Sequence, residues 1–168
     1  MEGSQLIRAR RSIRNYQSGV KIPQEQIQQM LEAAMMAPSA MNSRPWEFVV
    51  VESEQVKEQL MEVHPYCKML KTASLAIVVC GRPDLQASWG GQFWPQDCGA
   101  AIENLLLQAL ELGYGSCWCG CYPVMERVEK IQNVLSIESI PVGIVAIGVP
   151  NEHPEARGYF DPQRVKYL

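Results

Sequence analysis

The feature that most constrains the fold is a long apolar helix predicted over residues 96–112. Its apolar residues cover most of the circumference: Ala100, Ala101, Leu105, Leu106, Leu107, Ala109 and Leu110. A helix that is apolar nearly all round must be buried, either in the centre of a domain or at a subunit interface. No apolar run in the chain approaches the roughly 20 residues that cross a bilayer. The rest of the chain, or a second copy of it, must therefore cover this helix.

Short aliphatic and aromatic segments predict the strands that pack against this helix. Strands are expected at residues 46–51, 75–80, 116–120 and 142–149, and further helices before Arg10 and at residues 24–37, 54–63 and 124–135. Strands separated by helices indicate a mixed architecture of α and β layers. The length of 168 residues predicts a single domain, residues 1–168.

Two segments lack a periodic pattern. Residues 81–95 are rich in glycine, proline and tryptophan and are predicted to form a loop, which leaves a substrate lid as an open interpretation. Residues 150–168 are polar and proline-rich but end in Tyr167 and Leu168. We expect this tail to pack on another surface.

Charge is distributed unevenly along the chain. The 15 lysines and arginines and the 18 acidic residues give a net charge of −3, which argues against a general nucleic-acid-binding protein. Four arginines nevertheless lie between Arg8 and Arg14. A local cationic site in a mildly acidic protein suits a small anionic ligand.

The arginine run Arg10-Arg11-Ser12-Ile13-Arg14 predicts a phosphate site. In an extended backbone alternate side chains point to one side, so Arg10, Ser12 and Arg14 can converge on one ligand. Two guanidinium groups beside a hydroxyl offer rigid donors to the oxygens of a phosphate. The alternative is a basic helix end that lies in solvent.

A second polar motif is the loop Pro38-Ser39-Ala40-Met41-Asn42-Ser43-Arg44-Pro45-Trp46. Its prolines restrict the backbone, and its serines and asparagine offer several hydrogen-bonding groups. Taken alone, it would be interpreted as an ordinary helix-to-strand connection.

The six cysteines allow two interpretations. Cys117, Cys119 and Cys121 would project to one face of a strand, which suggests a metal or redox site. Zinc sites usually use pairs with two to four intervening residues, and cysteine is often simply buried, so packing is the favoured interpretation. No apolar segment of the secretory type follows the first arginines, so reduced thiols in the cytoplasm are expected.

In the order of these motifs, the chain resembles the nitroreductase family of FMN-dependent oxidoreductases. The resemblance rests on residues 10–14, on residues 38–46, on Gly115-Ser116-Cys117-Trp118 with Gly120, and on Asp97 and Asn104 in the long helix. It extends from Leu6 to Arg164. It implies an α+β fold with a mostly antiparallel central sheet flanked by helices. It also implies a homodimer with FMN at the subunit interface, on whose partner the tail of about residues 150–168 would pack.

The resemblance also assigns cofactor-binding residues. Arg10, Arg11 and Ser12 would hold the FMN phosphate, with Arg157 as a late cation, and Arg14 and Lys68 would lie along the pyrimidine edge of the flavin. The partner subunit would contribute Pro38, Ser39, Ala40, Met41 and Asn42, and the backbone of Cys119 and Gly120 would face flavin N5. Asp97 is expected to be an N-terminal or capping residue of its helix rather than a catalytic acid.

The expected function is hydride transfer from NAD(P)H through flavin N5 to a nitroaromatic, a quinone or a similar acceptor, by a ping-pong mechanism without a protein general acid. The sequence lacks a Gly-x-Gly-x-x-Gly motif, so NAD(P)H would be a transient substrate, and NADH and NADPH both remain open. Two alternatives remain. One is a specialised flavin enzyme of the dehalogenase-like or flavin-destroying type. The other is a non-flavin metal- or thiol-binding module built on Cys117, Cys119 and Cys121.

Overall fold

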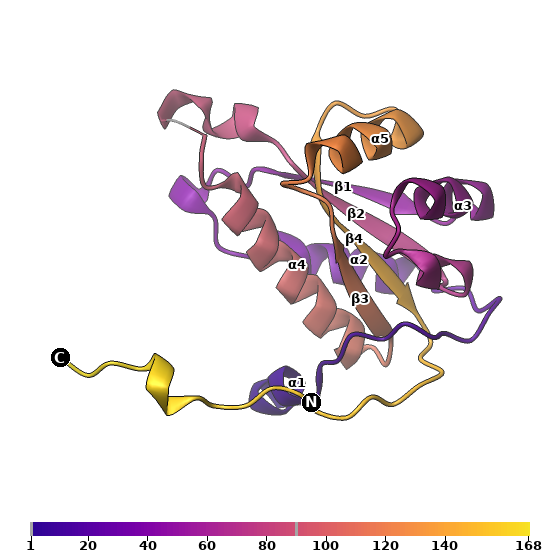
Figure 1. The fold of residues 1–168 in the computed structure, drawn as a ribbon, viewed down its shortest axis with the longest axis horizontal. Coiled ribbons are helices and arrows are strands. Elements are labelled where there is room, and N and C mark those ends of the chain that lie inside the picture. Colours follow the sequence, from indigo (N-terminus) through magenta and orange to yellow (C-terminus); the bar gives the residue numbers. More distant parts are fainter. Residues whose placement is uncertain (1, 90) are drawn as a thin grey trace.

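The computed structural model describes residues 2–89 and 91–168 and shows a four-stranded sheet between helical layers (Figure 1). The strands are β1 (Trp46–Val51), β2 (Leu75–Gly81), β3 (Gly115–Gly120) and β4 (Ile140–Gly148). Their order in the sheet is β1-β2-β4-β3, and all neighbouring strands are antiparallel. This arrangement confirms the predicted α+β fold. It also leaves β1 and β3 as the two edges of the sheet.

The helices lie close to their predicted positions. They are α1 (Gly3–Ala9), α2 (Gln24–Met35), α3 (Glu54–Val63), α4 (Trp94–Glu111) and α5 (Met125–Leu135), with short 3₁₀ turns η1 (Ala40–Asn42), η2 (Lys68–Lys71), η3 (Pro83–Trp89) and η4 (Pro162–Arg164). The predicted loop at residues 81–95 is wrong in part, because this segment contains η3 and the first two residues of α4. The physical reason is the burial of Trp94, whose ring covers Gly81 and lies 4.7 Å from the ring of Tyr122.

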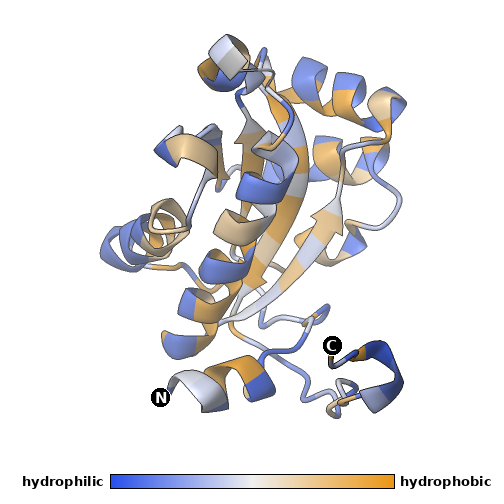
Figure 2. Cartoon of the chain, turned by 90° about the vertical axis from the view of Figure 1, so that its left-hand side faces the viewer, coloured by the Kyte–Doolittle hydropathy of each residue, from blue (hydrophilic) through white to orange (hydrophobic). Residues whose placement is uncertain are grey.

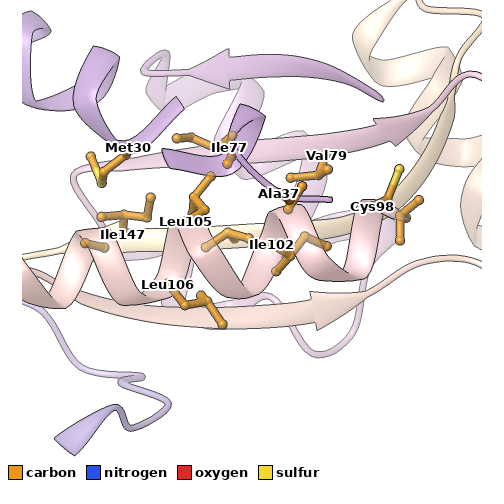
Figure 3. Packing of buried hydrophobic residues seen from close by; sticks show 14 of the residues in the cluster. Met30, Ala37, Ile77, Val79, Cys98, Ile102, Leu105, Leu106 and Ile147 are labelled. Carbon is orange, nitrogen blue, oxygen red and sulfur yellow. The ribbon is translucent and has the colours of Figure 1, made fainter. Parts of the chain in front are cut away.

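Side chains of β2 point alternately to the two faces of the sheet, and each face is covered by its own hydrophobic core. Leu75, Ile77 and Val79 of β2 pack with residues of α2 and α4, and Figure 3 shows the side chains from these helices meeting the sheet. The intervening residues of β2, among them Val78, pack on the other face with α3, α5 and η2. Because both faces are covered, β2 is apolar at every position, and the sheet is orange along its centre in Figure 2.

The predicted burial of the long helix is confirmed. Ala101, Ile102 and Leu105 of α4 are fully buried between the sheet and α2. The Asn104 side-chain amide donates to the carbonyl of Ala33 at 3.0 Å and ties α4 to α2, so this residue supports the packing of the helices.

The tail leaves the sheet after β4 and extends past α1, away from the body of the chain (Figure 1). Beyond Pro150 its only regular element in the described residues is the η4 turn. Tyr159 and Tyr167 are 78% and 91% exposed, so one chain alone does not cover them. Packing of the tail on a partner subunit therefore stays a prediction. Among the described residues, no helix combines the length and the apolar character needed to cross a membrane.

Candidate functional site

The candidate site is built on the free edge of β3. The backbone N–H of Cys121 donates to the carbonyl of Val142 in β4 at 2.9 Å. In an antiparallel pair every second residue bonds to the neighbouring strand, so the backbone N–H and C=O groups of Trp118 and Gly120 point away from β4. At Ser116 this edge is occupied, because its carbonyl accepts from the N–H of Ile13 at 2.9 Å. Farther along, the edge at Trp118 and Gly120 faces a cavity.

The arginine run is held against this edge by its own apolar residue. Ile13 is buried and lies on Gly115, where a Cβ atom would be only 2.7 Å from the Ile13 side chain. The Tyr16 hydroxyl donates to the carbonyl of Ile13 at 2.6 Å, and the carboxylate of Glu152 accepts from the backbone N–H of Arg14 and of Asn15. These contacts fix the backbone that carries Arg10, Ser12 and Arg14.

One cavity next to this segment, here called the arginine cavity, has a volume of about 680 Å³. The end of α1, the arginine run and the tail form its walls. Its cationic and hydroxyl residues are Arg8, Arg10, Arg11, Ser12, Arg14, Arg157 and Tyr159. The structure therefore brings Arg157 to the arginine run, across more than 140 positions of sequence. Glu155 is the one acidic residue of this lining.

Two arginines of this cavity also make contacts within the chain. Arg10 Nε lies 3.2 Å from a carboxylate oxygen of Glu103 on α4. Arg11 Nη1 donates to the carbonyls of Arg8 and Arg10, at 2.6 and 2.7 Å, and so satisfies acceptors at the end of α1. The Nε atom of Arg11 is buried and has no hydrogen-bond partner among the described residues. A buried unpaired donor is costly, and an anionic ligand in the cavity would supply its acceptor.

A second cavity, here called the edge cavity, has a volume of about 830 Å³ and lies along the free edge of β3. Its charged residues are Arg14, Lys68, Lys71 and Arg127, and none of the described residues that line it carries a carboxylate. Predicted residues Cys119 and Gly120 also line it. Arg14 belongs to the walls of both cavities, so the two adjoin at this residue. Both volumes are in the range that is typical of sites for small molecules and cofactors.

A hydrogen-bond network holds the carbonyl of Gly120 at the end of β3. Arg127 Nη1 donates to this oxygen at 2.7 Å, and His64 Nε2 lies 2.9 Å from it. His64 Nδ1 accepts from the backbone N–H of Tyr66 at 3.2 Å, which assigns the ring proton to Nε2. Burial lowers the pKa of His64, although the hydrogen bond to Gly120 opposes this shift, and the charge of Arg127 lowers the pKa further. His64 therefore acts as a neutral donor.

The sequence analysis did not identify His64, Tyr66 or Arg127. A single histidine and a single arginine at unremarkable spacing carry no motif. They meet only because α3 ends and α5 begins near the carbonyl of Gly120 at the end of β3. The one available signal was the lack of a carboxylate neighbour suited to Arg127, since Glu126 lies four residues before Lys130 and pairs with it at 2.6 Å.

The loop at residues 38–42 lies elsewhere in the chain. Neither cavity includes Pro38, Ser39, Ala40, Met41 or Asn42 among its lining residues. Figure 1 shows η1 beside the start of α4, whereas α1 lies near the other end of this helix. Within one chain, the structure thus does not bring these five residues to the arginine run.

Asp97 fixes the shape of this loop. One of its carboxylate oxygens accepts from the backbone N–H of Ala40 at 3.1 Å, and the other accepts from the Gln86 side chain at 2.7 Å. The expected position of Asp97 at the N-terminal end of its helix is confirmed, because it lies in the first turn of α4. Its side chain does not cap the helix, since the N-cap residue is Phe93 and the Asp97 carboxylate binds the loop instead. The backbone of Met41 and Asn42 has positive φ angles, and the Met41 side chain is 82% exposed, so a rigid turn projects from the surface.

The six cysteines are all unpaired and buried. Cys117 and Cys119 point into the core beneath α3 and α5, and Cys119 Sγ lies 3.8 Å from the sulfur of Met69. The neighbouring Cys117 thiol lowers the pKa of Cys119, but hydrogen bonding to Cys67 and burial outweigh it and raise this pKa to about 12. Burial raises the pKa of Cys121 to about 12 as well. In the described part of the chain, no group of three or more potential ligands is arranged to hold a metal ion.

Because the thiolate is the reactive form, these cysteines should be unreactive in the folded protein. A thiol with a pKa of about 12 is expected to react about a thousandfold more slowly at pH 8 than a free cysteine. Titration with an aromatic disulfide reagent should show slow reaction in native protein and six thiols in denaturant. In denaturant, a Cys119→Ala/Cys121→Ala variant should show four reactive thiols. Fast reaction of one or more thiols in the native protein would contradict the packing interpretation.

Two glycines of β3 offer a matched test of how the arginine run is held. Gly115→Ala is expected to lower the free energy of unfolding by about 1–3 kcal/mol, because the new methyl group would overlap Ile13. Gly120→Ala should change it by less than about 0.5 kcal/mol, since no atom lies within 4 Å of a Cβ at that position. Urea denaturation measures both changes. Equal losses would show that contact with Ile13 is not the cause.

The sequence and the fold of this chain are similar to those of known proteins. The model of the nitroreductase family matches residues 7–64 and 61–149. A protein of Methanothermobacter thermautotrophicus described as "Putative NADH dehydrogenase/NAD(P)H nitroreductase" is 44% identical over 98% of this chain and 86% of its own length. A structure from Clostridium acetobutylicum described as "Putative NADH Oxidase" is 38% identical with a TM-score of 0.89, over 96% of this chain and 97% of the other. An "FMN-dependent Nitroreductase" from Clostridium difficile R20291 is 29% identical with a TM-score of 0.85, over 96% of each chain. By sequence and by fold, the chain belongs to the nitroreductase family.

Proposed function

We propose that this protein is an FMN-dependent oxidoreductase that takes hydride from NAD(P)H and passes it to a nitroaromatic, a quinone or a similar acceptor. The observation that carries the proposal is the pair of cavities that adjoin at Arg14, one lined by arginines and the other by an open strand edge. A molecule with a phosphate at one end and a flat hydrogen-bonding ring system at the other matches this pair. The similar protein described as an FMN-dependent nitroreductase supports this choice of cofactor.

The residues of the arginine cavity suit the phosphate. Arg10, Ser12 and Arg157 line it together, and the unpaired buried Nε of Arg11 gains an acceptor when an anion is present. Arg10 is the cation whose ion pair with Glu103 orients its guanidinium group before a ligand arrives. These four residues would bind and orient the cofactor by its charged end.

The residues of the edge cavity suit the ring system. When bound, FMN supplies hydride transfer at its N5 atom. Arg14 and Lys68 place positive charge in this cavity, where it stabilises negative charge that develops on a ring during reduction. The backbone N–H of Gly120 points out of the sheet edge and is suited to donate to a ring nitrogen, while Cys119 anchors the strand in the core.

We further propose that the active form is a homodimer. The rigid turn at residues 38–42 projects from the surface and does not reach the cavities of its own chain, so a second copy would supply it to complete each site. The exposed aromatic residues of the tail would pack on the same partner. The six unpaired thiols suit a reducing compartment such as the cytoplasm.

Flavin absorption and reduction test this function directly. Purified protein, with FMN added if needed, should be yellow after gel filtration, and NADH or NADPH should bleach it anaerobically. Steady-state rates with a quinone as acceptor should give parallel double-reciprocal lines, because one pocket serves both substrates in turn. A protein that binds no flavin would overturn the proposal. Convergent lines would show that donor and acceptor bind together, and would overturn the ping-pong mechanism alone.

The structure gives no support to the alternative built on Cys117, Cys119 and Cys121. These thiols lie in the core, and burial raises the pKa of Cys121, while the interaction with Cys119 and burial raise that of Cys117. A lid at residues 81–95 that makes defined contacts with a bound substrate would favour the specialised flavin enzyme. In this segment the side chains of Gln86 and Trp94 are buried and hold it to the body of the chain, so we retain the general oxidoreductase.

A further inference from the structure

Arg127 is a cation of the edge cavity for which the proposed cofactor has no evident use. It lies in the first turn of α5 and is fixed on two sides. One amino group donates to the carbonyl of Gly120 at 2.7 Å, and the guanidinium carbon lies 5.7 Å from the centre of the Tyr66 ring. A guanidinium group has five N–H donors, and among the described residues Arg127 spends only one of them on a hydrogen bond.

The charges around Arg127 leave it without a counter-ion. Among the described residues no carboxylate lies within ion-pair distance of it, and the adjacent Glu126 is paired with Lys130 on the outer surface of α5. The lining of the edge cavity contributes no acidic side chain either. His64, which shares the Gly120 carbonyl, is neutral because its burial lowers its pKa. Arg127 therefore offers a fixed, unpaired positive charge to whatever enters this end of the cavity.

The neighbouring side chain adds an aromatic wall. Tyr66 is 69% exposed, and its ring is in contact with the guanidinium group of Arg127 at the cavity lining. A flat ring can pack on tyrosine while a carboxylate on that ring accepts from the remaining N–H groups of the arginine. Arg127 is hydrogen-bonded to the carbonyl of Gly120, the residue whose backbone is proposed to face flavin N5, so a ligand held by Arg127 would be next to the reacting centre.

From this geometry we infer that Arg127 selects electron acceptors that carry an anionic group, in particular aromatic carboxylates. The inference rests on the proposed function and extends it to a class of acceptor. Arg127 would bind the carboxylate of the acceptor directly, and Tyr66 would contact its ring. Arg127 is then a specificity-determining residue, and acceptors without a charge would gain nothing from it.

A matched pair of acceptors tests this inference in the holoenzyme. 4-Nitrobenzoate and 4-nitrobenzamide have the same nitro group and nearly the same size, and differ in charge. The wild-type kcat/KM should be higher for the benzoate. Arg127→Gln should lower kcat/KM for the benzoate by about tenfold or more, mainly through KM, and leave the value for the benzamide within about twofold. Arg127→Lys should retain part of the preference, because it keeps the charge and loses the planar fork.

Lys130→Gln is the control, since it removes one positive charge from the same helix at a position outside the cavity. It should leave both acceptors unchanged. Flavin content and the thermal unfolding midpoint show whether each variant is folded. Equal losses for both acceptors in Arg127→Gln would overturn the inference and indicate that Arg127 acts by holding Gly120. Unchanged kinetics for both acceptors would also overturn it.

Calorimetry separates this inference from the proposed function. The affinities of the purified protein for 4-nitrobenzoate and for 4-nitrobenzamide are measured from the heat of binding. This measurement needs neither flavin absorption nor catalytic turnover. If the protein binds no flavin, the proposed function fails, whereas a benzoate affinity that drops about tenfold in Arg127→Gln still supports an aromatic-carboxylate site. If flavin binds and NAD(P)H reduces it, but benzoate binds no better than benzamide, only the inference about Arg127 fails.

Discussion

An Arg10→Ala/Arg14→Ala variant is expected to bind FMN at least about 100-fold more weakly than the wild type. Each arginine would form a charge-assisted hydrogen bond, and loss of one such bond typically costs about 1.5–3 kcal/mol. The two guanidinium groups line the arginine cavity together, and Arg14 also reaches the edge cavity. Fluorescence titration of the apoprotein with FMN measures the dissociation constant.

A Lys21→Ala/Lys130→Ala variant is the matched control, because it removes the same charge at positions outside both cavities. Its affinity for FMN should equal that of the wild type. Arg14→Ala alone should also lower the reduction potential of the bound flavin, since a positive charge beside a developing anion favours reduction. Full retention of flavin at high dilution by the double arginine variant, with an unchanged potential in Arg14→Ala, would refute this assignment of the two arginines.

Mixed dimers are expected to regain activity that both parents lack. If each site takes the arginine run from one chain and the loop at residues 38–42 from the other, twofold symmetry places both lesions of a mixed dimer in one site. An Arg10→Ala/Arg14→Ala chain combined with a Ser39→Ala/Asn42→Ala chain would then have one site with every lesion and one intact site. The purified heterodimer should reach about half of the wild-type activity per dimer.

Differently tagged chains, co-expressed and purified over two affinity columns, give the heterodimer for this measurement. Each parent homodimer should be impaired but folded, as thermal unfolding will show. A heterodimer as inactive as either parent would mean that the two segments do not complete one site. In that case the site would be formed within a single chain, and the exposed turn at Met41 would need another explanation.

The sequence predicted the elements of the fold because their patterns are local. The apolar composition of residues 96–112 and of runs such as residues 75–80 is enough to predict that these segments are buried. The structure confirms them as α4 and β2. The main error was at residues 81–95, where glycine and proline suggested an open loop. Burial of Trp94 against Gly81 and Tyr122 is a contact between distant segments, and composition does not report it.

The candidate site likewise has parts that the local sequence predicts and parts that depend on contacts between distant segments. The sequence by itself determined the arginine run, because two guanidinium groups around a serine at alternate positions already define an anion-binding pattern. The resemblance to the nitroreductase family already assigned Arg157 to the phosphate, and the structure places it in one cavity with this run. Only the tertiary structure decided that Arg14 belongs to two cavities, and that the loop at residues 38–42 stays apart from both within one chain.

Tertiary structure alone also brought His64 and Arg127 to the carbonyl of Gly120. The physical reason is that the spacing along a chain fixes which side chains share one helix face or one strand face. Which faces then meet depends on the order of strands in the sheet and on the packing of α3 and α5 against it, and these result from the burial of the whole core.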